Sequence, residues 1–600
     1  MNTSTNTTIR QDIVHSLASQ QQSLLAKLLA QWELLLVIAL ALVALIPRII
    51  LATQLDVVTD EIVYILGGKV YLPLLLHLSI GNRGWMINYE HPPVVKLLIG
   101  TSLAINHIIG HPLNGLLAAR IPSILGGTAL VVIMYLLGRR PFGHVVSLLA
   151  ALTLAVSPWL VYFSALAYLD MTMTMFATIA VLLIWHAIYH PKLYLLVALF
   201  IGLGAASKYT AVLVVPSMFI FTAYYFFVLR FYLPKAQRPR LPWRMWIAAI
   251  IGAPLLFLLA DPAIWPSPIA LLLHSFDFEW NHSIHGHLTF LAGQYSTHVP
   301  PWSILYILLV KLSIFVTIPA AFFVLYALVQ LVRFHWRHAI SVEEASSIAF
   351  LLIWLVTTAA MFSLLNIVVG THYELPAAPP TAFAGAFGMT VLWRYRRGSL
   401  FAPTKTTNNA APAAEPAISP TPTTSTLARP LARARFNPAI MLIAVAMLLL
   451  MVLPHLIGLV TIPDAEGYTS EIFQGENSAL QVAYPGYRNA LIWLSNHISP
   501  DQGRVSIGLV ALVDTLSGQD GVSWYSYNED FVQRYKLVEA HPTDATFPYD
   551  YLVWPMHLVQ RGYKIPSNWR THIVHIIMGG NTIYCFIMAR NPGTIITQSQ

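Results

Sequence analysis

The stretch that decides the fold is ELLLVIALALVALIPRIILAT, residues 33–53, an apolar run long enough to cross the hydrocarbon core of a bilayer as one helix. Similar runs recur along most of the 600-residue chain, which is 56% hydrophobic, 10% charged and has a mean hydropathy of +0.64. A soluble core cannot bury so much apolar surface. Because a helix satisfies its own backbone hydrogen bonds in lipid, the sequence predicts a polytopic α-helical membrane protein.

We expect about eleven membrane-spanning helices from the apolar runs, at 33–53, 117–138, 143–163, 171–189, 193–207, 208–228, 245–260, 304–332, 347–369, 375–393 and 438–460. The run 93–110 is also apolar, but a span there would place Arg139 and Arg140 outside and break the alternation of the later basic loops. It is therefore predicted to be a re-entrant or membrane-surface helix. This arrangement predicts a plasma-membrane protein with a cytoplasmic N-terminus and an extracytoplasmic C-terminal domain.

The predicted domains follow from these spans. They are a cytoplasmic N-terminus (1–32), a transmembrane module (33–397) with outer loops 54–116 and 261–303, a disordered cytoplasmic linker rich in Pro, Thr and Ala (398–437), a last transmembrane helix (438–460) and an extracytoplasmic domain (461–600). Short strand-like runs between Gly, Pro and Asp residues predict a small α/β fold for that last domain.

The net charge of +8 does not indicate nucleic acid as a partner. From Asp464 to the end there are 12 acidic and 8 basic residues, so this part carries −4 and the remainder +12. The positive excess lies in the loops that membrane topology places in the cytoplasm. The single cysteine, Cys585, excludes an intrachain disulfide and a cysteine-based metal cage.

Two groups of polar residues interrupt the apolar pattern early in the chain. Asp60 and Glu61 follow the first span directly. They form either a solvated helix cap or a catalytic pair, in which one carboxylate accepts the proton of an attacking hydroxyl; two carboxylates also suit a divalent cation. The second group is YEHPPVVK, residues 89–96, which gathers Glu90, His91 and Lys96 around a Pro-Pro turn.

These motifs resemble those of the polyprenyl-phosphate-dependent glycosyltransferases of GT-C fold, specifically the bacterial members of the protein O-mannosyltransferase and aminoarabinose-transferase group. That family carries an Asp-Glu pair in its first outer loop and then a His-Pro-Pro stretch that ends in Lys, as Asp60-Glu61 and His91 to Lys96 do here. Weaker similarities continue to residue 376, at Arg120, Asp170, Lys208 after Gly202-Leu203-Gly204, His285-Gly286-His287, Pro301-Trp302 and His372 to Pro376. The tail from about 464 differs from the β-trefoil domain of eukaryotic protein mannosyltransferases, so a protein acceptor does not follow from the resemblance.

The resemblance implies roles for particular residues. Asp60 is expected to be the general base, and Glu61 to orient the acceptor or a neighbouring cation. Cations stabilise a leaving phosphate, so Lys96, Arg120 and Lys208 are candidate ligands of the carrier phosphate, although each can instead extend its charge to the interface from an apolar stem. The remaining donor-binding candidates are Glu90, His91, Asp170 and His372. The cofactor stays open; Glu90 and His285 are the candidates for a metal such as zinc.

The resulting expectation is a membrane glycosyltransferase. It would move a mannose-like hexose or a pentose from a polyprenyl-phosphate carrier to a hydroxyl of a protein, lipid or polysaccharide at the outer face, with inversion at the anomeric carbon. A transporter or flippase of lipid-linked glycans is the alternative, and it should show repeat symmetry and polar residues at mid-span. A non-catalytic subunit is a further alternative, for which the loss of Asp60 would change nothing.

Overall fold

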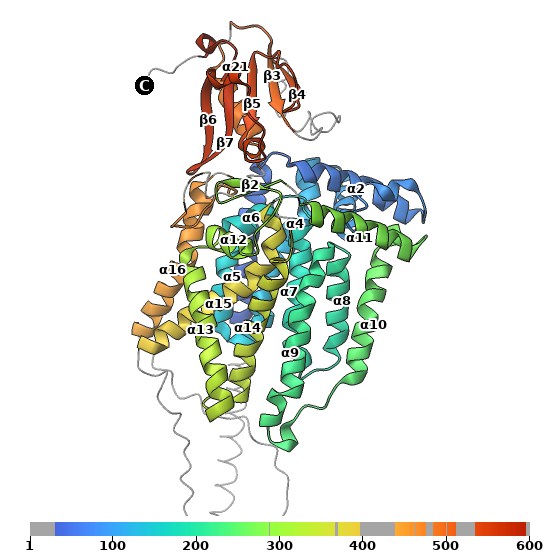
Figure 1. Ribbon diagram of the computed structural model, residues 1–600, viewed down its shortest axis with the longest axis vertical. Helices are drawn as coiled ribbons and strands as arrows, with labels where there is room; N and C mark the ends of the chain where they lie inside the picture. Colours follow the sequence, from blue (N-terminus) through green and yellow to red (C-terminus); the bar gives the residue numbers. More distant parts are fainter. Residues whose placement is uncertain are drawn as a thin grey trace, which may run out of the picture.

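The computed structural model describes residues 31–286, 288–366, 370–396, 438–462, 464–473, 475, 484–499, 501–511 and 534–595. A helical module, blue to yellow in Figure 1, carries a small sheet domain, drawn in red, at one end. We call this end of the module the domain face. The predicted linker 398–437, residues 1–30 of the predicted N-terminal segment, and His287 lie outside the described residues.

The helical module has the predicted polytopic character. Seven described helices are long and apolar enough to cross a membrane. They are Gln31–Gln54, α4 (Gly115–Phe142), α7 (Asp170–Ala187), Tyr209–Tyr232 including α9 (Val215–Phe227), α10 (Trp243–Ala260), α13 (Ile314–Arg337) and α14 (Val342–Phe362). The fold class predicted from the sequence, a mostly helical multi-pass membrane protein, is confirmed.

The predicted number of about eleven spans is larger than the seven described helices of span length, because several of the apolar runs form helices that are short or bent. α5 (His144–Ala155) and α6 (Pro158–Ser164) form a pair bent by 62°, which would make an eighth span if the pair is one. α8 (Leu193–Ala205) has 13 residues and is too short for a full crossing. Helices also occupy the last two predicted spans, as α15 (Ala378–Arg396) and α16 (Pro438–Thr461).

Short elements cover the domain face of the module. α2 (Thr59–Leu76) and α11 (Pro268–His285) lie across this end of the bundle, transverse to its long helices (Figure 1). α3 (Val94–Ile108), expected as a surface or re-entrant helix, has 15 residues and does not reach the length of a span. The other elements here are η1 (Arg83–Met86), η2 (Tyr209–Val214), η5 (Pro262–Ile264), β1 (Thr289–Leu291), β2 (Gln294–Ser296), α12 (Ser303–Lys311) and η6 (Thr371–Ala377).

The C-terminal domain is the small α/β unit that the sequence predicts. Its five strands lie in the order β4-β3-β5-β7-β6, with β3 parallel to β4 and β5, and β7 antiparallel to β5 and β6. The strands are β3 (Val505–Val510), β4 (Tyr535–Ala540), β5 (Tyr551–Pro555), β6 (Ile573–Gly579) and β7 (Thr582–Ala589), and the helices are α17 (Tyr487–His497), α20 (Met556–Gln560) and α21 (Ser567–Arg570). Every residue of β5 is buried, because it is the central strand and is covered on both faces.

Residues 464–473 connect this domain to the module. The buried Lys311 ammonium, at the end of α12, donates to the carbonyl of Glu466 at 2.7 Å and to that of Tyr468 at 3.2 Å. The Ser470 amide donates to the carbonyl of Val310 at 2.7 Å. These bonds satisfy carbonyls at the end of α12 and in the incoming chain, so the domain is attached through backbone contacts at the boundary.

Two glycines let α2 and α3 approach each other closely. A Cβ atom on Gly100 would lie 2.3 Å from the carbonyl oxygen of Gly68, and one on Gly68 would lie 2.7 Å from the carbonyl oxygen of Lys96. Contacts this short with backbone atoms cannot be relieved by a side-chain rotation. The two glycines therefore fix the distance between the helix that carries Asp60 and the helix that carries Lys96.

We expect Gly100→Ala to lower the unfolding temperature of the protein in lipid or detergent, because the methyl group would force the helices apart at a cost of about 1–3 kcal/mol. Gly115→Ala is the matched control, since nothing lies within 4 Å of its added Cβ and it begins α4. Thermal unfolding of both variants measures the difference. Equal stability of the two variants would contradict the close approach.

Candidate active site

The two adjacent acids of the motif stand in the first turn of α2, where the positive end of the helix dipole favours carboxylates. Their side chains have different surroundings. Glu61 is completely buried, whereas Asp60 is only half-buried. The structure thus separates two carboxylates that the sequence places side by side.

Glu61 forms a bidentate ion pair with the buried Arg120 of α4. The guanidinium donates from Nε to Oε1 at 2.8 Å and from Nη2 to Oε2 at 2.6 Å. The same carboxylate also accepts from the backbone amides of Ala167 at 2.7 Å and Val58 at 2.9 Å. With four donors Glu61 is fully satisfied, as a buried charge must be.

The other donors of Arg120 go to the backbone that precedes α2. Nη1 donates to the carbonyls of Ala52 at 2.8 Å and Leu55 at 3.0 Å, and Nη2 to that of Asp56 at 2.5 Å. All five N–H groups of this guanidinium are therefore used within the protein. The sequence-based expectation for Arg120 was contact with the carrier phosphate; the geometry instead makes it, with Glu61, a structural pair that holds loop 55–58.

Asp60 faces a polar cluster made by several distant segments. Burial raises the pKa of this carboxyl above its ordinary value, while the positive charges of Arg561 and Lys208 and a hydrogen bond with Tyr168 act in the opposite direction. Tyr168 lies in the loop before α7, and Arg561 belongs to the C-terminal domain. Asp60 is thus a partly accessible carboxylate on which the charges of two cations act.

Asp170 and Lys208 form a buried ion pair in this cluster. The Lys208 Nζ lies 2.7 Å from Oδ1 of Asp170 and 3.9 Å from the ring centre of Tyr373. Asp170 begins α7, and Lys208 stands between α8 and η2. Two residues that the sequence selected separately, 38 positions apart, therefore come together beside Asp60.

Lys96 organises the loop that contains the Pro-Pro turn. Its Nζ donates to the carbonyl and the side-chain oxygen of Asn88, at 2.7 and 2.9 Å, and to the carbonyl of His91 at 2.7 Å. These three bonds use all the protons of the ammonium group. Like Arg120, the predicted phosphate ligand Lys96 instead holds backbone in place.

The other two predicted residues of this loop, Glu90 and His91, also have polar neighbours. The Nδ1 of His91 lies 3.3 Å from Oε1 of Glu279 in α11, and the Glu90 carboxylate accepts a hydrogen bond from Asn88. Burial raises the pKa of Glu279 to about 7 and lowers that of His91 well below its ordinary value. His91 and Glu279 are therefore a neutral imidazole and a carboxyl that titrates near neutrality.

The last predicted residue of the site, His372, lies in η6. It is buried in η6, with its ring 5.4 Å from those of Phe163 and Tyr168 and 4.6 Å from that of Tyr373. The ring of Tyr168 also lies 5.8 Å from that of Tyr64 in α2, so His372 is joined through Tyr168 to the helix that carries Asp60. Burial lowers its pKa well below the ordinary value, so the imidazole is neutral.

The metal candidates are not part of a ligand cluster. Within the described residues, no group of three or more His, Cys, Asp or Glu side chains could hold a metal ion. His285 is exposed at the end of α11, where its Nδ1 pairs with the carbonyl of Asn281 at 2.8 Å.

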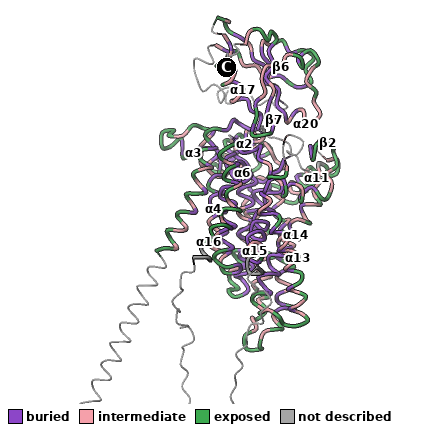
Figure 2. Tube along the Cα trace, turned by 90° about the vertical axis from the view of Figure 1, so that its left-hand side faces the viewer, coloured by how far each residue is buried: buried purple, intermediate pink, exposed green. Residues whose placement is uncertain are grey.

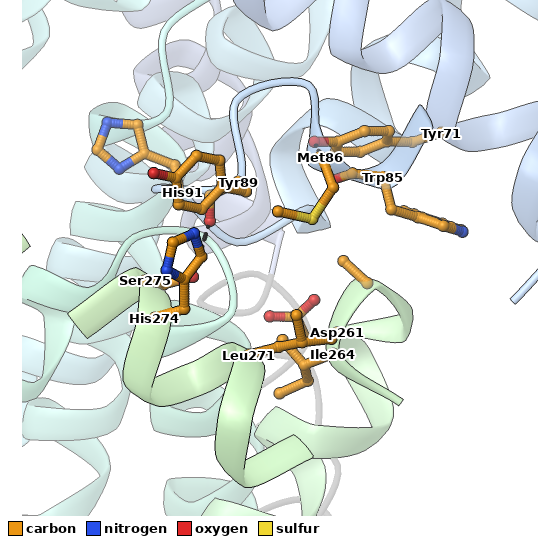
Figure 3. A pocket seen from close by; sticks show the side chains of 11 residues that line it. Tyr71, Trp85, Met86, Tyr89, His91, Asp261, Ile264, Leu271, His274 and Ser275 are labelled. Carbon is orange, nitrogen blue, oxygen red and sulfur yellow. Dashed lines mark hydrogen bonds between the residues drawn. The ribbon is translucent and has the colours of Figure 1, made fainter. Parts of the chain in front are cut away.

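A small pocket opens beside His91 on the domain face. Its walls include Tyr71, Trp85, Tyr89 and the carboxylate of Asp261. Figure 3 shows the aromatic side chains on one side of the space and Asp261 with Ile264 and Leu271 on the other. Burial raises the pKa of Asp261 to about 7, and its Oδ1 has no hydrogen-bond partner in the described part of the chain.

Several residues of this region were missed by sequence reasoning. Asp261 follows α10 directly, just as Asp60 follows the first span closely. An acid at the end of an apolar run was therefore a sequence signal that could have identified Asp261. Glu279 stands in a loop that was selected only for its histidines. Tyr168 and Arg561 carry no comparable signal, because only the fold brings them to Asp60.

Comparison with known proteins supports the family resemblance. Residues 90–265 match the family model described as dolichyl-phosphate-mannose-protein mannosyltransferase. The match confirms, over this segment, the resemblance to polyprenyl-phosphate-dependent glycosyltransferases. No curated protein matches the chain.

Solved structures give more distant similarities. ArnT from Cupriavidus metallidurans bound to undecaprenyl phosphate is 11% identical, with a TM-score of 0.43 and coverage of 95% of this chain and 99% of that chain. The oligosaccharyltransferase of Archaeoglobus fulgidus in the apo form is 13% identical, with a TM-score of 0.45 and coverage of 88% and 70%. Likenesses at this level do not define the fold or the function of this chain.

We expect Glu61→Gln to destabilise the protein strongly, because it leaves the buried charge of Arg120 without its counter-ion, at a cost of about 3–5 kcal/mol. The matched control is Glu33→Gln, which removes the partner of Arg139 from a more exposed pair and should cost about 1 kcal/mol or less. Folded yield and thermal unfolding measure both variants. A Glu61→Gln protein as stable as the control would show that the pair does not hold the loop.

Proposed function

We propose that this chain is a membrane glycosyltransferase that moves a sugar from a polyprenyl-phosphate carrier to a hydroxyl group, with Asp60 as the general base. One observation carries the proposal: of two adjacent carboxylates, Glu61 is locked by Arg120, while Asp60 stays half-exposed beside the Asp170–Lys208 pair. The family match supports it, since the matched segment 90–265 contains Asp170 and Lys208, two of the charged groups that act on Asp60.

The proposed chemistry is a single displacement. The acceptor hydroxyl gives its proton to a carboxylate oxygen of Asp60 while its own oxygen bonds to the anomeric carbon. The bond from that carbon to the phosphate oxygen breaks, and its electron pair leaves with the polyprenyl phosphate. Attack opposite to the leaving group inverts the anomeric carbon.

Among the three predicted cations, Lys208 is the one we propose for the leaving phosphate. The N–H donors of Lys96 and Arg120 are used within the protein, whereas the Lys208 ammonium donates, among the described residues, one hydrogen bond, to Asp170. A phosphate that gains charge in the transition state can therefore be stabilised by this ammonium in a site of low dielectric constant. We propose that Glu90, His91, Asp170 and His372 line the donor site around it.

We propose that the domain face is the outer face of a plasma membrane. At the opposite end of the module lie Arg139 and Arg140 of α4 and Arg337 of α13, each in the last turn of its helix. Arginines at span ends mark the cytoplasmic side. The Gln31–Gln54 helix then starts in the cytoplasm, and the acceptor reaches Asp60 from outside.

The proposed donor carries a mannose-like hexose or a pentose, and the proposed acceptor is a hydroxyl of a protein, a lipid or a polysaccharide.

The loss of the base tests the proposal. We expect Asp60→Asn to reduce sugar transfer by about 10²–10⁴-fold, because the amide cannot accept the proton. Purified protein in lipid nanodiscs would be given radiolabelled undecaprenyl-phosphate-mannose and a membrane extract as acceptor source, and label leaving the donor would be counted. Other carrier-linked hexoses and pentoses would follow.

Asp501→Asn is the control for this experiment, since Asp501 is an exposed aspartate of the C-terminal domain. The variant should turn over like the wild type. Equal activity of Asp60→Asn and wild type would refute the base assignment. Failure of all donors, together with movement of the lipid across the bilayer, would favour the flippase instead.

The pH dependence follows from the sign of the Asp60 shift. The base must be ionised, and burial raises its pKa, so kcat/KM should fall with decreasing pH at a value above about 4, where an ordinary aspartate titrates. A pH–rate profile of the wild type gives this acid limb. A limb at or below about pH 4 would mean that burial does not govern the titration of Asp60.

A further inference from the structure

The helix α11, at the domain face, is packed along one side on the loop 89–96 that contains the Pro-Pro turn. The ring of His274 stacks on that of Tyr89, with 4.7 Å between the ring centres and 9° between the planes. The Ser275 hydroxyl donates to the Tyr89 carbonyl at 3.0 Å, and the Phe278 ring meets the Tyr89 ring edge-on at 5.7 Å. These three residues share one face of α11, because side chains three or four positions apart are neighbours on a helix.

The opposite side of α11 carries a row of exposed apolar side chains. They recur at intervals of three or four residues and are 55–77% exposed: Ile269, Leu273, Phe276, Trp280 and Ile284. At 3.6 residues per turn all five lie within about 80° around the helix axis, nearly opposite the residues that meet Tyr89. We call this row the apolar stripe. Within it the rings of Phe276 and Trp280 are stacked, 5.9 Å apart at 20°.

The composition of α11 indicates what kind of surface the stripe contacts. Continuous rows of exposed large apolar side chains mark a contact with a partner or with a membrane. α11 is not among the seven described helices that are long and apolar enough to cross a membrane, and it carries Asp277 and Glu279 beside the stripe. A helix with one apolar and one polar side, too polar to span, is typical of the boundary between membrane and water.

α10 places the start of α11 at this boundary. No residue of this span, all of which the structure describes, is buried inside the protein, and Ile251, Leu255 and Leu259 are exposed along one side. Lipid is the solvent of such a surface. α10 ends at Ala260, and α11 begins at Pro268 after η5 and then lies across the end of the long helices, below the sheet domain, in both views (Figure 1, Figure 2). The stripe thus begins close to the point where the lipid-facing surface of α10 ends.

We propose that α11 is an interfacial helix whose apolar stripe is inserted into the bilayer leaflet on the domain side, while its other face holds the loop 89–96. The partner of the stripe is the boundary between lipid headgroups and acyl chains, where an amphipathic helix buries its apolar side chains about 5–10 Å deep. Trp280 fits this place, because Trp is enriched at membrane interfaces. The inference concerns a contact with lipid and does not depend on the proposed sugar transfer.

The bilayer and the candidate site then hold the same helix from two sides. Glu279 of α11 contacts the site through its Oε1, which lies 3.3 Å from Nδ1 of His91. Lipid contact along the stripe therefore supports the position of a helix whose side chains belong to the surroundings of the predicted site residues.

Depth-dependent fluorescence quenching of the full chain in lipid nanodiscs tests the insertion. Leu273→Cys and Phe276→Cys, labelled with a polarity-sensitive fluorophore, should emit at shorter wavelength than labelled Asp501→Cys, at an exposed position of the C-terminal domain. Lipids with a nitroxide near the headgroup should quench the two stripe labels more than lipids with a nitroxide at the end of the acyl chain. Ile251→Cys, near the middle of α10, should show the reverse order.

Asn281→Cys is the matched control on α11, since Asn281 is exposed and lies about a quarter of a turn from the centre of the stripe. Its label should be quenched less than the label at Phe276. The one cysteine of the chain, Cys585, is buried, so the unsubstituted chain gives the background of labelling.

Four results would overturn the insertion. One is equal quenching at Asn281 and Phe276, and another is a stripe label as exposed to water as the label at Asp501. A depth order like that of Ile251 would place α11 inside the hydrocarbon core. Stripe labels shielded from water but quenched by neither nitroxide would show that protein, such as a second copy of this chain, covers the stripe.

A charge within the stripe should release the helix from lipid. Phe276→Asp should weaken the quenching of a label at Leu273 by the headgroup-region nitroxide, because an ionised carboxylate is costly in apolar surroundings. Asn281→Asp should leave that quenching in place. Unfolding temperatures identify variants that remain folded, and Phe276→Ser is the milder substitution. Unchanged quenching at Leu273 in a folded Phe276→Asp or Phe276→Ser protein would contradict the role of the stripe.

Discussion

The buried ion pair between Arg120 and Glu61 is the interaction on which the candidate site depends. It joins α4 to the first turn of α2 and, through the carbonyls of Ala52, Leu55 and Asp56, fixes the loop between them. A buried pair rarely adds net stability over apolar packing, but removal of one partner is costly. Its effect here is geometric, because Asp60 cannot move without disturbing the fully buried charges of Glu61 and Arg120 and the end of the first span.

As a consequence, the two neighbouring carboxylates have different surroundings. Glu61 accepts from four donors and has no capacity left for a substrate, while Asp60 is half-exposed among cations and tyrosines. Lys96 and Lys208 also differ in their partners. Lys96 closes the His-Pro-Pro loop with three bonds, and Lys208 pairs with Asp170 inside the cluster. Low dielectric constant makes each unpaired polar group expensive, so a site built from so many charges needs some of them as structural partners of the others.

The C-terminal domain belongs to the same arrangement. Arg488 donates to the final carbonyls of the span before Asp60, and Lys311 binds the chain that enters the domain. Contacts of this kind are made at backbone atoms of the module's outermost loops, where helix ends leave carbonyls without partners. They tie the position of the C-terminal domain to that of the loop before Asp60.

The sequence by itself determined the class of the protein and much of its outline. Apolar runs of span length have one solution in lipid, and the alternation of short runs with turn residues after 461 indicated the small α/β domain that is found. It also selected Asp60, Asp170, Lys208 and His372, since polar groups in apolar surroundings are costly and stand out. Only the tertiary structure decided which of two adjacent acids is accessible, that Arg120 and Lys96 serve the backbone, and that Arg488 of the C-terminal domain binds the loop before Asp60. Whether all the donors of a side chain are already used, and which distant residues lie together, depend on the positions of many atoms. Residue type and spacing along the chain do not give these positions.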